Sequence, residues 1–177
     1  MKTLVIHPQD PSTKFLSQIY KDKDWTIFTD HSRNISKSKF KKLVRDHDRI
    51  IMMGHGCPSG LFYSHITSEI VYILREKICV CIWCNADQFV NKYGLKGFYT
   101  GMFISEVSEA GWFNIETTQE QVDFSNHLFT DLVALNIDKN DVDLHQTLKE
   151  NYYSDECPVI QYNNDRLYVQ TEETINS

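Results

Sequence analysis

The chain has 177 residues, of which 41% are hydrophobic and 24% charged, a composition typical of one globular domain with its own core. Its net charge of -6 argues against nucleic acid as the main partner, because phosphate binding requires clustered Lys and Arg. No apolar stretch reaches the roughly 18 residues that a membrane helix needs, so no membrane partner is expected. The basic run of residues 37–45 is expected to be the solvated face of a helix.

Short apolar runs bounded by turn residues predict five strands along the first part of the chain. They are residues 3–7, 25–28, 50–53, 78–83 and 97–102. Apolar residues at helical spacing predict helices between them, at residues 13–20, 36–45, 64–76 and 87–92. Ser12 is expected to cap the first of these helices.

The C-terminal part is expected to be mainly helical. The predicted helices are residues 103–111, 117–135 and 141–152. Residues 158–162 and 166–169 flank Asn163-Asn164-Asp165, a pattern that predicts a terminal strand folding back as a hairpin. Residues 171–177 are expected to be a polar tail after a single domain of residues 1–170.

Strands and helices that alternate in this way predict an α/β fold. We expect three layers, αβα, with a mostly parallel central sheet of about six strands. The strand order does not follow from the pattern.

Two reactive side chains follow predicted neighbouring strands. The segment of residues 50–83 reads as strand, crossover helix and strand, so His55 and Cys84 should leave the sheet at the same edge. His7, Asp10, Asp30 and Asp87 are expected at that edge too. An imidazole beside a thiol favours a thiolate near neutral pH, and a helix that begins after Cys84 adds to this effect. The N–H of Gly56 is unshielded by any side chain and can hold an oxyanion.

These residues resemble the motif of the caspase-like cysteine peptidases, a group that includes caspases, legumains, gingipains, separases and CHAT domains. The matching blocks are Ile50-Ile51-Met52-Met53-Gly54-His55-Gly56 and Cys79-Val80-Cys81-Ile82-Trp83-Cys84. The resemblance implies a caspase-like fold, with His55 as general base and acid, Cys84 as nucleophile and Gly56 as oxyanion donor. The chain departs from the family in Trp83, where a small residue is usual, in a short interval of 29 residues between His55 and Cys84, and in the competing thiol of Cys57.

The first functional hypothesis is therefore a peptidase or related thiol hydrolase acting on a peptide or protein. Asp10, Asp30 and Asp87 are expected to line a pocket for a basic side chain of that substrate. No cofactor is expected. A metal site is not expected either, because Cys79 and Cys84 face opposite ways on a straight strand and His7-Pro8-Gln9-Asp10 lacks the further ligands of a metal motif.

Two alternatives remain open at the level of sequence. In one, the glycine-rich loop of residues 54–60 holds a nucleotide or another anion. In the other, a caspase-like or Rossmann-like fold serves as a non-catalytic interaction domain, with His55 as a turn residue and Cys84 as one more buried thiol. The five cysteines are expected to be reduced, and no signal peptide is apparent, which predicts a cytoplasmic protein.

Overall fold

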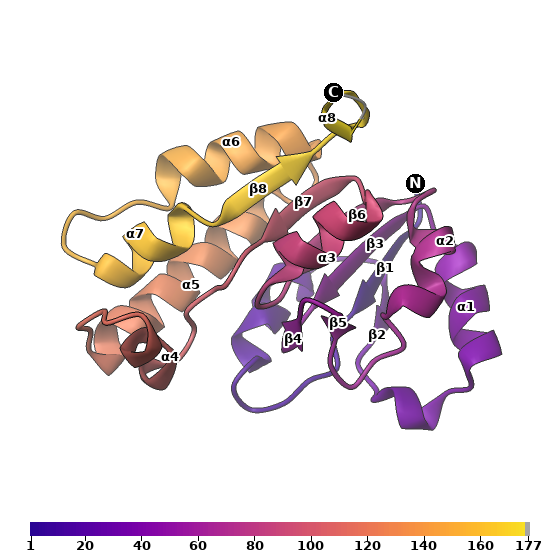
Figure 1. Ribbon diagram of the computed structural model, residues 1–177, viewed down its shortest axis with the longest axis horizontal. Coiled ribbons are helices and arrows are strands. Elements are labelled where there is room, and N and C mark those ends of the chain that lie inside the picture. The colour runs from indigo at the N-terminus through magenta and orange to yellow at the C-terminus, as the bar shows by residue number, and fades with distance from the viewer. Residues whose placement is uncertain (176–177) are drawn as a thin grey trace.

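The computed structural model describes residues 1–175 and contains a six-stranded sheet between two layers of helices (Figure 1). The strand order is β2-β1-β3-β6-β7-β8. The strands are β1 (Thr3–Ile6), β2 (Thr26–Phe28), β3 (Arg49–Met53), β6 (Ile78–Ile82), β7 (Gly97–Thr100) and β8 (Leu167–Gln170). The first five run parallel, and β8 pairs antiparallel with β7. The predicted three-layer α/β fold with a mostly parallel sheet is confirmed.

Each face of the sheet carries its own layer of helices and its own core. One layer holds α1 (Lys37–Arg45), η3 (Ser68–Ile70), α2 (Val71–Leu74) and α3 (Ala86–Tyr93). The other holds η1 (Lys14–Tyr20), α4 (Val107–Trp112), α5 (Gln119–Asn136), α6 (Asp141–Asn151) and α7 (Pro158–Asn164). Successive strand residues alternate between the two cores, so Ile50 and Met52 pack under α1 whereas Ile51 and Met53 pack under η1 and α5.

Two helices begin with side-chain caps. The hydroxyl of Ser36 accepts the N–H of Lys39 at 3.4 Å and caps α1. Thr118 and Gln121 form a reciprocal capping box at the start of α5, in which each side chain bonds the other residue's backbone N–H.

The predicted terminal hairpin is wrong. Residues 158–162 belong to helix α7, which begins with Pro158 at its first position, where proline needs no N–H partner. The predicted turn of residues 163–165 is the end of this helix and its C-cap. Only β8 remains as a strand, and it completes the edge of the sheet beside β7.

Two helices predicted in the N-terminal part differ from the expectation. One is shorter than predicted, and the other is a 3₁₀ helix. The crossover of residues 64–76 is helical only over η3 and α2, because Ser64 and Ile66 bond back to Leu61 in the preceding hairpin. That hairpin consists of β4 (Gly56–Cys57) and β5 (Gly60–Leu61). The helix of residues 13–20 is a 3₁₀ helix, η1, and Ser12 does not cap it.

The remaining described elements are η2 (Ser32–Asn34) and α8 (Glu172–Ile175). The helix α8 occupies part of the segment predicted as a polar tail, and residues 176–177 of that tail lie outside the described residues. Within residues 1–175, none of the helices has an apolar stretch long enough to cross a bilayer.

Charge is unevenly divided along the chain. Residues 1–100 hold 15 of the 18 Lys and Arg but only 9 of the 24 Asp and Glu. These residues and residues 101–175 occupy separate halves of the molecule (Figure 1). Among residues 1–175, three ion pairs join the halves: Lys23–Asp138, Arg49–Asp141 and Lys96–Glu172.

Candidate active site

His55 and Cys84 follow neighbouring strands, each two residues beyond the last residue of its strand. The strands β3 and β6 are parallel with Met53 opposite Ile82. The N–H of Gly54 donates to the carbonyl of Ile82 at 3.1 Å, so the pairing continues almost to the point where the two side chains leave the sheet. Gly54 has φ +138°, a value that favours glycine and that redirects the chain into His55.

Two further predicted edge residues lie on the same side of the sheet. His7 follows β1 and Asp30 comes two residues after β2. Because the strand order begins β2-β1-β3-β6 and all four strands are parallel, His7, Asp30, His55 and Cys84 end neighbouring strands at one edge. This part of the prediction is confirmed.

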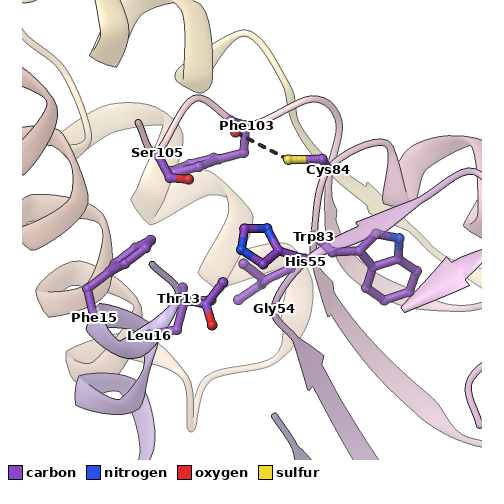
Figure 2. Close-up of a pocket in the computed structure, with 10 residues that line it drawn as sticks. Thr13, Phe15, Leu16, Gly54, His55, Trp83, Cys84, Phe103 and Ser105 are labelled. Carbon is purple, nitrogen blue, oxygen red and sulfur yellow. Dashed lines mark hydrogen bonds between the residues drawn. The ribbon is translucent and has the colours of Figure 1, made fainter. Parts of the chain in front are cut away.

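One cavity is lined by both His55 and Cys84 (Figure 2). The other lining residues are Thr13, Phe15, Leu16, Gly54, Ile82, Trp83, Phe103 and Ser105. Its volume is about 20 Å³, which is room for about one water molecule. A substrate carbonyl therefore enters only after one of the lining side chains moves.

One nitrogen of His55 has two partners from the loop after β1. Its Nε2 lies 2.6 Å from Oγ of Ser12 and 3.2 Å from Oδ2 of Asp10. Its Nδ1 has no hydrogen-bond partner among residues 1–175. In Figure 2 one ring nitrogen is directed to the side of the cavity on which Cys84 and Phe103 lie. The free nitrogen and the thiol thus share one space.

The Asp10 carboxylate is held by the first residues that follow it. Its Oδ1 accepts from the N–H of Ser12 at 2.9 Å, the hydroxyl of Ser12 at 2.8 Å and the N–H of Thr13 at 3.1 Å. Partial burial acts to raise the pKa of Asp10, but these hydrogen bonds and the nearby His55 hold it below its usual value. Asp10, which the sequence predicted as a substrate contact, is therefore a carboxylate in contact with His55.

The surroundings of Cys84 favour its protonated thiol. Burial raises its pKa to about 11, and the carboxylate of Glu109 adds to the effect. Its Sγ donates to the carbonyl of Phe103 at 3.4 Å, and no hydrogen bond joins it to His55 among residues 1–175. These surroundings oppose the thiolate expected near neutral pH, because burial and the acidic neighbours both raise the pKa of Cys84.

Gly56 lies against Trp83 and does not line the cavity. A Cβ at Gly56 would lie 2.2 Å from Cδ1 of Trp83, so only glycine fits there. The indole N–H of Trp83 also donates to the carbonyl of Cys57 at 3.2 Å. Trp83, which departs from the family pattern, thus fixes the loop that carries His55 onto the strand that carries Cys84. The oxyanion role of Gly56 stays a prediction.

The three acidic residues do not form one pocket. Asp10 borders a hollow of about 400 Å³ together with His31, Ser32, Arg33 and Tyr63. Asp30 is exposed after β2. Asp87 lies in the first turn of α3, where its Oδ1 is buried without a hydrogen-bond partner among residues 1–175. Only Asp10 lies beside the catalytic candidates.

Sequence reasoning missed three neighbours of the pair, namely Ser12, Phe103 and Glu109. The first had a local signal, because an Asp followed two and three residues later by Ser and Thr favours a turn closed by the carboxylate. The other two come from a loop and a short helix more than fifteen residues beyond Cys84. No local pattern places them there.

Three further predictions concern metal ligation, the glycine-rich loop and the cysteines. Within residues 1–175, no group of three or more His, Cys, Asp and Glu is arranged to hold a metal ion. The loop of residues 54–60 is a tight hairpin in which a Cβ at Gly60 would meet the carbonyl oxygen of Ile66 at 2.0 Å. Gly56 and Gly60 thus allow close packing within this loop, and anion binding there stays a prediction. The five cysteines, all among the described residues, are unbridged.

Comparisons with known proteins give no family. No family model matches the chain, and no curated protein matches it. Among solved structures, the fold is similar to the apo form of an NADH:FMN oxidoreductase (EMOB), with a TM-score of 0.44 and 12% identity. The match covers 80% of this chain and 92% of that one. A likeness of this degree indicates neither substrate nor chemistry.

Proposed function

We propose that this chain is a cysteine-dependent hydrolase of the caspase-like type that acts on a peptide or protein, with Cys84 as nucleophile and His55 as general base. One observation carries the proposal. His55 and Cys84 end adjacent parallel strands and line one cavity, and within residues 1–175 one nitrogen of His55 has no hydrogen-bond partner on that side.

The raised pKa of Cys84 determines the order of events. A thiol with a pKa of about 11 stays protonated at neutral pH until substrate arrives. Attack on the substrate carbonyl then forms the S–C bond while the S–H proton passes to His55. The leaving amine takes this proton as its C–N bond breaks, and water hydrolyses the thioester. No cofactor takes part. Five unbridged cysteines suit a reducing compartment such as the cytoplasm.

Substitutions at Cys84, His55 and Cys57 test the proposal. Purified wild-type protein is offered a library of fluorogenic peptides, and the best substrate is then used with Cys84→Ala, His55→Ala and Cys57→Ala. Cys84→Ala and His55→Ala should lower kcat/KM by about 100-fold or more. Cys57→Ala is the matched control and should keep most of the activity. Hydrolysis that survives Cys84→Ala excludes Cys84 as the nucleophile.

A second candidate is a non-catalytic interaction domain with the same fold. The narrow cavity and the protonated thiol favour it. It predicts that no peptide is cleaved at any pH, while a protein partner binds equally well to wild type and Cys84→Ala.

A further inference from the structure

The environment of Nε2 indicates which nitrogen of His55 carries the proton. We propose that Asp10 holds neutral His55 in the form protonated on Nε2, so that Nδ1 is the base that receives the proton of Cys84. The inference rests on the proposed function for its chemical role and makes Asp10 a positioning residue.

The choice between the two forms of the ring follows from the two atoms beside Nε2. The carboxylate oxygen of Asp10 has no proton to donate, so an unprotonated Nε2 would face it lone pair to lone pair at 3.2 Å. A protonated Nε2 donates to Oγ of Ser12 at 2.6 Å and presents the positive end of its N–H to the carboxylate oxygen of Asp10. The lowered pKa of Asp10 supports the ionised carboxylate on which this argument depends.

The Ser12 hydroxyl fits the same assignment. It has one proton, and Oδ1 of Asp10 accepts it at 2.8 Å. Its lone pair is then free to accept from Nε2 of His55. The short contact with His55 resembles a serine–histidine pair, but a nucleophile and an orienting carboxylate need opposite nitrogens of the ring. Here both occupy Nε2, which makes Ser12 part of the support and not the nucleophile.

The carboxylate is held in place from behind. Asp10 accepts two backbone N–H groups from Ser12 and Thr13, and the hydroxyl of Thr13 lies 3.4 Å from Nε2 of His7. His7 is fully buried, and burial lowers its pKa to about 4, so it adds no positive charge near Asp10 at neutral pH. The negative charge of Asp10 therefore interacts with His55 rather than with a charged His7.

Proton transfer strengthens this arrangement. When Nδ1 takes the proton of Cys84, the S–H bond breaks, the S–C bond forms and the ring becomes an imidazolium. Its positive charge then lies beside the Asp10 carboxylate, 3.2 Å from Nε2, and the two opposite charges attract each other. The proton leaves Nδ1 for the amine as the C–N bond breaks, and the ring returns to its starting form.

The test is the position of the ring proton, observed without substrate. Two-bond ¹H–¹⁵N correlation spectra of the seven His rings at pH 8.5 report which nitrogen is protonated, and His55→Gln assigns the signal of His55. Wild type, Ser12→Ala and the exposed control Asp24→Asn should show the proton of His55 on Nε2. Asp10→Asn keeps an oxygen for the backbone N–H groups but removes the charge, and should give a mixture of both forms.

A proton on Nδ1 in the wild type, or an Asp10→Asn spectrum identical to that of the wild type, overturns the inference. Activity provides a second measurement, in which Asp10→Asn should lower kcat by about tenfold or more with little change in KM. Loss of hydrolysis in Ser12→Ala but not in Cys84→Ala also overturns it. The spectra remain interpretable if no peptide is cleaved, so failure of the proposed function is distinguishable from failure of this assignment.

Discussion

At the scale of single residues, the thiol of Cys84 is governed by what surrounds it rather than by its place before a helix. Burial removes water from the thiolate, and Glu109 and Glu106 repel it. The hydrogen bond that Sγ donates to the carbonyl of Phe103 is made by the protonated thiol and is lost when the thiolate forms. Reactivity in the absence of substrate is therefore low, which protects the thiol from adventitious oxidation.

The pH dependence of alkylation tests this account. Because the pKa is raised to about 11, the thiolate fraction rises tenfold per pH unit up to that value. The iodoacetamide rate at Cys84, followed by mass spectrometry in a Cys57→Ala background, should rise across pH 7 to 10 without a plateau. Glu109→Gln keeps the oxygen that caps Ser105 and should raise the rate at pH 8 several-fold.

The control for this measurement is Glu116→Gln, which lies outside the contacts of Cys84 and should leave the rate unchanged. A plateau below pH 8 in the wild type would show an activated thiol and contradict the account.

The raised pKa of Cys84 also affects the stability of the fold. Because the folded pKa is the higher one, the native state keeps its proton where the unfolded chain loses it, and stability falls between about pH 9 and 11.

At the scale of elements, helix α7 carries a buried side chain whose contacts no local pattern reveals. Asn163 is fully buried; its Oδ1 accepts the N–H of Ile104 at 2.7 Å, and its Nδ2 donates to the carbonyl of Ile104 at 2.9 Å. The same amide lies 3.2 Å from the hydroxyl of Tyr152. Asn163 on α7 thus holds in place the loop whose Phe103 carbonyl accepts the hydrogen bond of Cys84.

Replacing Asn163 measures the strength of this anchor. Asn163→Ala leaves the N–H and carbonyl of Ile104 buried without partners, and each such group costs about 1–3 kcal/mol. We expect the free energy of unfolding in urea to fall by about 2–6 kcal/mol. Asn151→Ala, an exposed asparagine on α6, is the control and should change it by less than about 0.5 kcal/mol. A loss no larger than that of the control would mean that water replaces the amide.

The sequence was informative wherever one stretch decides the structure. Short apolar runs separated by helical patterns predicted the five parallel strands. The right-handed crossover between two of these strands predicted that His55 and Cys84 lie at one edge of the sheet. It misled at residues 158–162, because a short apolar run after a proline suits a strand or the first turn of a helix. It could not place Phe103, Glu109 or Asn163, whose contacts join segments up to 59 residues apart. The protonated state of Cys84 depends on those contacts.

At the scale of the whole molecule, a buried ion pair ties the two halves together at the opposite edge of the sheet. Arg49 at the start of β3 bonds Asp141 at 2.6 Å and the carbonyl of Ile137 at 2.5 Å. Burial nevertheless raises the pKa of Asp141 despite the nearby guanidinium. Keeping the carboxylate of Asp141 ionised thus costs free energy. We expect the Arg49–Asp141 pair to determine how the two halves pack together more than to stabilise the fold.

Single and double replacements separate these roles. Arg49→Met leaves a buried carboxylate without its cation and should lower the free energy of unfolding by about 3–5 kcal/mol. Arg49→Met with Asp141→Leu should recover most of that loss. Lys42→Met breaks an exposed pair with Asp46 and should have no measurable effect. If the double variant is no more stable than Arg49→Met, the pair itself stabilises the fold.

The uneven division of charge between the two halves makes the molecule a permanent electric dipole, which its net charge of -6 conceals. In the field of a charged surface or polymer such a body experiences a torque and turns one half forward before any contact forms. Salt limits the reach of this alignment to a Debye length of about 8 Å at physiological ionic strength. The side on which a charged molecule first touches this chain is therefore set by the sign of that molecule's charge.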